Sequence, residues 1–129
     1  MKIQKFEDLN IWNDSVAIAK EIYLITNEGK FGKDFGLRDQ IRRAIVSVSS
    51  NIVEGFEKNN NNEFVRYLRI AKGSAGEVRS QLYIVLEIEY ISRNNFEKMS
   101  EKLKKLSAQT GSFISYLEKN KNSPARETR

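Results

Sequence analysis

The charged residues between positions 38 and 79 are those whose type and spacing best suit a chemical task. This segment holds eight bases and five acids, in a chain whose net charge is +5. Arginine and lysine neutralise phosphate groups without reading base sequence, so such a surplus favours binding to a nucleic-acid backbone. We therefore expect seven residues to contact RNA or DNA: Arg38, Arg42, Arg43, Arg66, Arg69, Lys72 and Arg79.

Enzymatic chemistry finds little support in this sequence. The 129 residues include no histidine and no cysteine, which excludes imidazole acid–base catalysis, thiol chemistry, disulfides and metal sites built from those two residues. The stretch Gly73-Ser74-Ala75-Gly76 is similar to a phosphate-binding loop, but it lacks the Lys-Ser/Thr ending and falls inside an expected helix. We predict a protein that is not an enzyme, with no catalytic residue, no cofactor and no metal.

A group of small and polar residues interrupts the apolar pattern of the expected helices. Small side chains let helix axes approach closely, and residues three apart, such as Asn51 and Glu54, share a helical face. We interpret the group as a structural polar cluster that fixes the register of neighbouring helices. Its members are Ser47, Ser50, Asn51, Glu54 and Glu77.

An ion pair inside the fold is the alternative role for two of the arginines. Glu54 is expected near a helix C-terminus, where a carboxylate opposes the helix dipole and needs a cationic partner. Arg42, Arg43 and Lys58 are the candidates, and Glu77 is a second acid that either arginine could meet. An arginine used in this way would not be free to bind phosphate.

Four long amphipathic segments must position these residues. Apolar residues recur at alternating spacings of three and four over about residues 7–28, 35–54, 63–92 and 96–119, the pattern of packed helices. Asp34 and Asn62 are the expected N-terminal caps of the second and third helices, and Gly55 is the expected stop of the second. Short loops between them predict an all-α, up-and-down four-helix bundle over residues 1–120, with a polar tail over 121–129.

Two of the segments carry more apolar surface than one core needs. A helix that is apolar over a wide arc is buried on more than one side, so we expect a homo-oligomer. The alternative is that the second stripes make ordinary contacts within one chain. The first segment shows the pattern clearly, with one stripe of Leu9, Trp12, Val16, Ala19, Tyr23 and Thr26 and another of Ile11, Ile18, Ile22 and Ile25.

Membrane and export signals are the remaining features that a sequence can reveal. No apolar run is long enough to cross a bilayer, and the first residues include acids where a signal peptide needs an apolar stretch. We therefore expect a cytoplasmic protein that does not contact the membrane.

The motifs taken together resemble those of a known bacterial family. They are Phe6-x-x-Leu9-x-x-Trp12, Phe35-Gly36-Leu37-x-x-Gln40-Ile41-Arg42-Arg43-Ala44-x-x-Ser47, Ser50-Asn51-Ile52-x-Glu54-Gly55 and Phe64-x-x-Tyr67-Leu68-x-Ile70-Ala71-x-Gly73-Ser74-x-x-Glu77. Over about residues 6–117 the chain resembles four-helix-bundle proteins encoded by intervening sequences within 23S ribosomal RNA genes. It is also similar to the accessory variability proteins of diversity-generating retroelements. The resemblance implies a left-handed up-and-down bundle that assembles as a homopentamer.

Two functions are open on these grounds. The first is a non-enzymatic scaffold that binds RNA or DNA, in which assembly repeats the cationic residues as a ring of positive potential. The resemblance supports it, because it implies a basic pentamer that binds nucleic acid. The second is an adaptor that holds a separately encoded protein on outer apolar residues.

Overall fold

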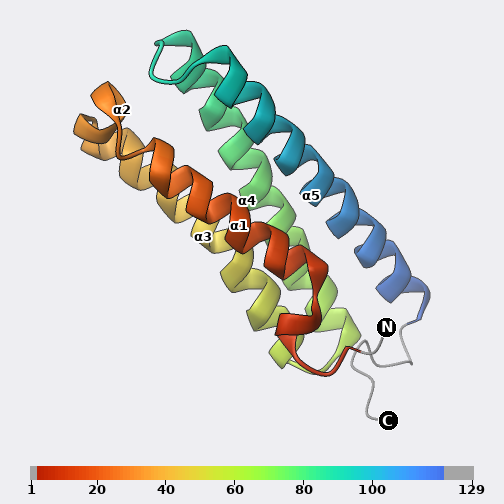
Figure 1. Ribbon diagram of the computed structural model, residues 1–129. Coiled ribbons are helices and arrows are strands. Elements are labelled where there is room, and N and C mark those ends of the chain that lie inside the picture. Colours follow the sequence, from red (N-terminus) through yellow and green to blue (C-terminus); the bar gives the residue numbers. More distant parts are fainter. Residues whose placement is uncertain (1–2, 121–129) are drawn as a thin grey trace.

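The computed structural model describes residues 3–120, and all regular structure within that range is helical. A short 3-10 helix, η1 (Phe6–Asp8), precedes α1 (Asn10–Ile25), α2 (Gly29–Lys33), α3 (Phe35–Glu57), α4 (Asn61–Glu87) and α5 (Arg93–Lys119). The four long helices lie side by side as a bundle (Figure 1). The all-α prediction is confirmed, and no helix within residues 3–120 is long and apolar enough to cross a membrane.

Helices α3 and α4 form the closest pair in the bundle. Ser47 meets Ser74, and Gly55 lies against Tyr67, so residue numbers rise along α3 as they fall along α4. The two helices are therefore antiparallel. Small residues at these contacts allow the close approach, as the sequence indicates.

Helices α4 and α5 are antiparallel as well. The ring of Tyr83 packs on Phe96, while the Lys72 stem approaches Gly111 at the other end of the contact. The handedness of the bundle and the number of subunits stay predictions.

The core is built from the residues that recur at three-four spacing, because these project from one side of each helix. In α4 the predicted stripe is fully buried: Phe64, Leu68, Ala71, Ala75, Val78, Leu82 and Val85. In α5 the residues at three-four spacing are buried as predicted, except near the C-terminal end of the helix. There Ile114 is buried, and Phe113 is only partly buried against the core. Four helices thus close around one continuous apolar interior.

Helix α1 buries its second stripe more deeply than its first. Ile18 and Ile22 are inside the core, whereas Val16 and Tyr23 are each 41% exposed. The prediction that the stripe containing Val16 and Tyr23 forms the seam is wrong in that part. The Tyr23 ring lies against the Arg42 guanidinium of α3, and both side chains leave apolar surface exposed.

The end of α1 differs from the expected one. The helix stops at Ile25, and residues 29–33, expected as a simple link, form the short helix α2. Gly29 begins α2 with a φ of +55°, a conformation that suits glycine, and Phe31 is fully buried. Burial of Phe31 explains why the link is ordered as a helical turn.

Two later boundaries also need correction. Gly55 does not stop α3, because the helix runs on to Glu57 with Gly55 and Phe56 buried against α4. Asp34 caps α3 as predicted, its carboxylate accepting from the Leu37 N–H, but Asn60 caps α4 in place of Asn62. A capping residue must precede the first turn, and α4 begins two residues earlier than its apolar pattern indicates.

The connection between α4 and α5 lies at residues 88–92, earlier than the expected turn at 93–95. The α4 helix ends at Glu87, and Ser92 caps α5 by accepting from the Asn95 N–H. Arginine and asparagine at 93–95 therefore form the first turn of α5. The polar residues favoured a loop, but the serine cap before them sets the boundary.

The contact between α1 and α5, hereafter the α1–α5 seam, is the most loosely packed in the bundle. A hollow of about 210 Å³ lies at its middle, over Ile18 and Leu106. A second of about 310 Å³ lies beside Leu9 and Phe113, and a third of about 160 Å³ lies beside Met99. The seam is bridged by an ion pair in which Lys102 Nζ lies 2.7 Å from Glu21 Oε1.

Candidate nucleic-acid interface

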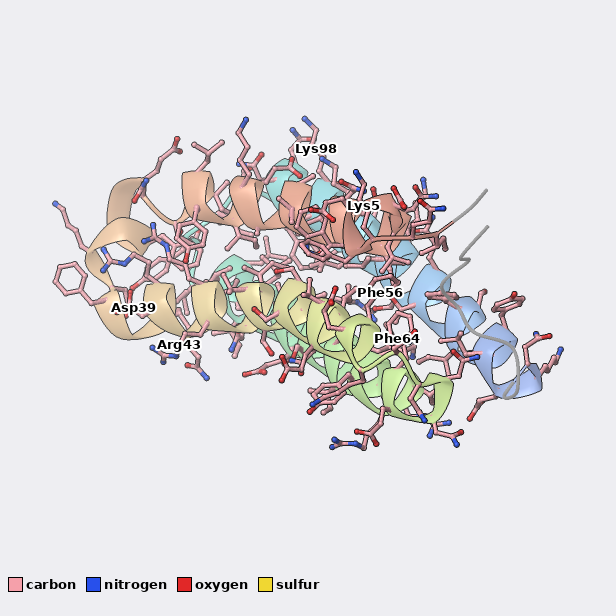
Figure 2. The ribbon with its side chains drawn as sticks, turned by 90° about the horizontal axis from the view of Figure 1, so that it is seen from below. Lys5, Asp39, Arg43, Phe56, Phe64 and Lys98 are labelled. Carbon is pink, nitrogen blue, oxygen red and sulfur yellow. The ribbon has the colours of Figure 1, made fainter. Side chains whose placement is uncertain are left out.

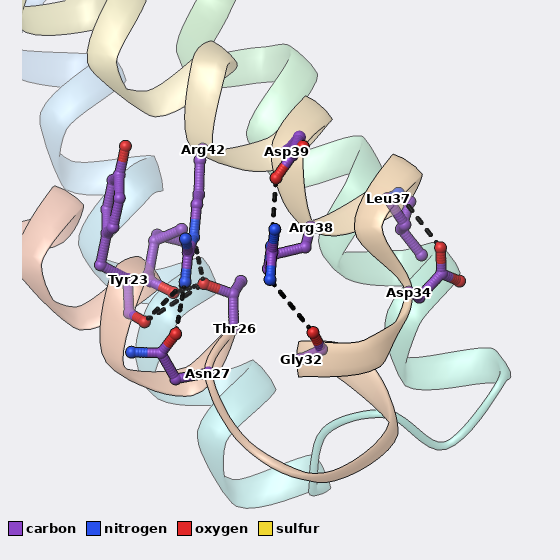
Figure 3. A network of polar contacts seen from close by, with 10 residues as sticks. Tyr23, Thr26, Asn27, Gly32, Asp34, Leu37, Arg38, Asp39 and Arg42 are labelled. Carbon is purple, nitrogen blue, oxygen red and sulfur yellow. Dashed lines mark hydrogen bonds and ion pairs between the residues drawn. The ribbon is translucent and has the colours of Figure 1, made fainter.

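Arg42, one of the predicted nucleic-acid contacts, ties α3 to the end of α1 (Figure 3). Its Nε donates to Thr26 Oγ1 at 2.8 Å, and its Nη2 donates to Asn27 Oδ1 at 2.8 Å and to the Tyr23 carbonyl at 3.4 Å. The guanidinium also lies 4.5 Å from the centre of the Tyr23 ring. A cation at a helix C-terminus is favourable, so Arg42 serves the fold and pairs with neither Glu54 nor Glu77.

Arg38 is similarly engaged next to α2 (Figure 3). Its Nε pairs with Asp39 Oδ1 at 3.1 Å, and its Nη1 donates to the Gly32 carbonyl at 3.2 Å. The guanidinium also covers the ring of Phe35 at 4.6 Å. Arg38 and Arg42 lie four residues apart on one face of α3, and this face is turned toward α1 and α2.

Arg43 projects from the outer side of α3, away from the core that Phe56 and Phe64 help to fill (Figure 2). It is exposed and makes no hydrogen bond or ion pair with any other residue between 3 and 120. It lies on a different helix from the four remaining cations, which all belong to α4. The seven predicted residues therefore divide into an internal pair, a solitary arginine and a group on α4.

The first two α4 cations are held by acids at the surface. Arg66 pairs with Glu63 at 3.1 Å, and this hydrogen bond lowers the pKa of the Glu63 carboxyl. Arg69 Nη2 pairs with Glu118 of α5. Exposed ion pairs of this kind contribute only about 0–1 kcal/mol, so phosphate can replace the carboxylate at little cost.

The other two α4 cations lie along α5 and have no acidic partner among the described residues. Lys72 passes close to Gly111, since a Cβ there would lie 3.4 Å from Lys72 Cε. Arg79 lies about two turns after Lys72 on α4, and Lys104 lies about two turns before Gly111 on α5. Because the two helices are antiparallel and Lys72 meets Gly111, Lys104 lies beside Arg79. The Nζ of Lys104 is 4.0 Å from Glu101 Oε1. We call Arg69, Lys72, Arg79 and Lys104 the α4–α5 cationic face.

The Arg79 side chain carries a buried polar atom without a partner. Its Nε is shielded from solvent yet makes no hydrogen bond within residues 3–120. A buried N–H normally has an acceptor, so this donor stays unused while the side chain keeps this arrangement. It lies on the α4–α5 cationic face, where an anion would be attracted.

Two glycines leave open space on the surface of α4 beside these cations. Gly73 and Gly76 point outward, and a Cβ on either would meet nothing within 4 Å. Neither glycine packs against another helix within residues 3–120. Their neighbour Ser74 does make the expected contact, with its hydroxyl 3.0 Å from that of Ser47. The open space lets a backbone ligand approach the helices closely.

The predicted polar cluster forms only in part. Asn51 Nδ2 donates to the Ser47 carbonyl at 2.8 Å and to the Ser47 hydroxyl at 3.0 Å, which joins it to the Ser47–Ser74 pair. Glu77 instead accepts from Gln81 at 3.5 Å. Ser50 and Glu54 are exposed and make no hydrogen bond in the described part of the chain, so the expected cation beside Glu54 is absent there.

Sequence reasoning missed the contribution of α5 to this surface. The helix carries six bases (Arg93, Lys98, Lys102, Lys104, Lys105 and Lys119) against three acids (Glu97, Glu101 and Glu118). The segment used to count charge ended at Arg79, so this excess of three was not weighed. A count over each expected helix would have found it.

An apolar strip accompanies the cations on the other edge of α4. Ile70, Ile84 and Ile88 are 44%, 50% and 47% exposed, and the exposed Glu77 lies on the same edge between Ile70 and Ile84. Three large aliphatic side chains at this exposure along one edge are available for contact with another molecule. This strip corresponds to part of the second stripe predicted for the third long helix.

The bundle and its surface define an all-helical protein with a cationic face and an exposed apolar strip. The chain belongs to the 23S rRNA-intervening sequence protein family, whose model matches residues 7–112. The resemblance inferred from the sequence motifs is thereby confirmed.

A solved structure supports the fold. The chain is similar to a protein of unknown function from the S23 ribosomal protein family of Bacteroides thetaiotaomicron, with 24% sequence identity and a TM-score of 0.73. The match covers 81% of this chain and 95% of the other. No curated protein matches the chain.

Proposed function

We propose that the protein is a non-enzymatic, homo-oligomeric scaffold that binds the backbone of RNA through its α4–α5 cationic face. The observation that carries the proposal is that Lys72 and Arg79 of α4 follow one another along α5 without an acidic partner among the described residues, beside open surface at Gly76. Phosphate oxygens would pair with these cations and displace the weak surface carboxylates of the neighbouring ion pairs. Contacts of this kind are independent of base sequence.

Self-association is proposed to strengthen this binding. The apolar strip of Ile70, Ile84 and Ile88 supports contact with another copy, which would remove these side chains from water. The family resemblance implies a left-handed up-and-down bundle in each copy and an assembly of five copies. Each copy offers few cations, so a ring that engages one RNA at several points would gain affinity through multivalency.

Binding to RNA across a salt series tests the proposal. Fluorescence anisotropy with a structured RNA should give an affinity that falls steeply as salt rises. The double variant Lys72→Gln/Arg79→Gln should lower the salt slope by about two, because two phosphate contacts are lost. Lys30→Gln/Lys33→Gln on α2 makes the same charge change elsewhere and should leave binding nearly unchanged. Equal effects of the two doubles would contradict a specific face.

An adaptor for a separately encoded protein is the second candidate, favoured by the same apolar strip. The molar mass measured by light scattering distinguishes self-association through that strip from binding of another protein. A stable oligomer that Ile70→Lys/Ile84→Lys converts to a monomer would support self-association. A monomeric wild-type protein that ignores RNA at low salt would instead favour the adaptor.

A further inference from the structure

An exposed aromatic ring continues the α4–α5 cationic face beyond Arg79. Tyr83 follows Arg79 by one turn on the same edge of α4 and is 51% exposed. Its ring packs on Phe96 of α5, with the centroids 4.8 Å apart and the planes at 63°. Because Phe96 is only 7% exposed, it anchors the tyrosine ring while leaving about half of that side chain open.

The charge pattern changes at this tyrosine. Lys72 and Arg79 precede it along α4, whereas no base follows it on that helix and Glu87 lies one turn further on. On the neighbouring turns of α5, Glu97 stands between the exposed bases Arg93 and Lys98. Along α4, phosphates are therefore attracted as far as Arg79. What fits at Tyr83 is an uncharged planar group carried by the same ligand.

We propose that the RNA on this face is single-stranded and that one of its bases stacks on Tyr83. The inference rests on the proposed function and adds the class of RNA to it. In a duplex the bases are paired and stacked on one another, so none is free to lie on the ring. A single strand places its phosphates on the cations and turns one base onto the ring, the combination found in proteins that bind single strands.

The distance along the helix suits such a short contact. From Lys72 to Tyr83 the α4 helix rises by about 16 Å. The α4–α5 cationic face thus accommodates a few nucleotides of one single strand. Stacking is tolerant of sequence because every base has a planar face. One such site in each copy would let a small cationic surface prefer single-stranded over double-stranded RNA without reading bases.

Affinity for paired oligonucleotides tests the inference. The probe is a single-stranded RNA of about 12 nucleotides, compared with the same RNA annealed to its complement. We expect the wild type to prefer the single strand, Tyr83→Ala to weaken that binding roughly tenfold, and Tyr83→Phe to retain it. Tyr116→Ala removes an equally exposed tyrosine, 52% open, from α5 outside this face and should have no effect.

The outcomes separate this inference from the function on which it rests. Unchanged binding by Tyr83→Ala, or preference of the wild type for the duplex, overturns the stacking proposal. If Lys72→Gln/Arg79→Gln still lowers affinity in either case, the cationic face remains supported. A wild-type protein that binds neither RNA at low salt overturns both. Circular dichroism melting of each variant confirms that it is folded.

Discussion

Gly55 of α3 and Tyr67 of α4 approach so closely that residue 55 has no room for a side chain. A Cβ at this position would lie 2.7 Å from Tyr67 Cβ and 3.0 Å from Phe64 Cδ1. Both neighbours are tied to the α4 backbone, so neither can yield without moving the helix. The glycine therefore sets the spacing of the tightest helix pair.

Replacement of this glycine should destabilise the protein despite alanine's greater helix propensity. For Gly55→Ala we expect the free energy of unfolding to fall by about 1–3 kcal/mol, because the added methyl overpacks the contact. Gly73→Ala is the matched control, since a Cβ there meets nothing within 4 Å. That variant should gain about 0.5–1 kcal/mol. Urea denaturation measures both, and a Gly55→Ala protein as stable as wild type would contradict the packing account.

A larger side chain at Ser47 should also disrupt the α3–α4 contact. Ser47→Leu removes the hydroxyl that meets Ser74 and Asn51 and adds volume between two helices. The free energy of unfolding should fall by about 1–3 kcal/mol. Ser50→Leu, at an exposed position on the same helix, should stay within about 0.5 kcal/mol. Equal melting temperatures and equal oligomer mass for Ser47→Leu and wild type would show that the site tolerates bulk.

Arg42 should matter for stability more than for RNA binding. Arg42→Ala removes three hydrogen bonds to the end of α1 and the contact with Tyr23. We expect a loss of about 1–2 kcal/mol, and only partial recovery in Arg42→Lys, because an ammonium group cannot reproduce the planar fork. Arg43→Ala, which deletes an exposed neighbour, should leave the melting temperature unchanged. A similar loss in both variants would argue against the network.

The hydrogen bond from Tyr90 to Asp34 should make the stability of the fold depend on pH in the alkaline range. The phenol donates to Asp34 Oδ2 at 3.0 Å, and this bond raises the pKa of Tyr90 above its ordinary 10.0. The folded state holds the proton more tightly than the unfolded state. The stabilisation is therefore complete below about pH 10 and is lost as pH rises through the raised pKa.

Melting temperatures across that range provide the check. Tyr90→Phe should melt below wild type at pH 8, and the gap should narrow as pH rises above about 10. Tyr116→Phe alters an exposed phenol and serves as the control. A gap that stays constant with pH would mean that the proton on Tyr90 does not contribute.

Periodicity predicted the class of the fold because burial follows the helical repeat. The stripe from Phe64 to Val85 is buried in full, and the Asp34 cap is where the sequence places it. The predicted helix boundaries were less accurate where a contact between helices overrode the local preference of a residue for a helix end. Gly55 has the sequence signature of a helix stop, but its lack of a side chain is used for packing against Tyr67.

The candidate site was only partly visible in the sequence for a similar reason. Basic residue type indicates a capacity to bind phosphate, whereas availability depends on neighbours distant in sequence. Arg42 is engaged by Thr26 and Asn27, from another helix and its link, while Lys72 borders Gly111 from α5. A helical wheel of one segment cannot distinguish these cases, because the partners come from elsewhere in the bundle.

The hollows along the α1–α5 seam have a consequence for the order in which the bundle opens. Helix α1 buries four of its residues, whereas α4 buries ten, and the far side of α1 rests on loosely filled space. Regions with few buried contacts open at lower free energy than the global transition. Amide protons of α1 should therefore exchange with deuterium first, while α3, α4 and α5 persist as a slower cooperative unit.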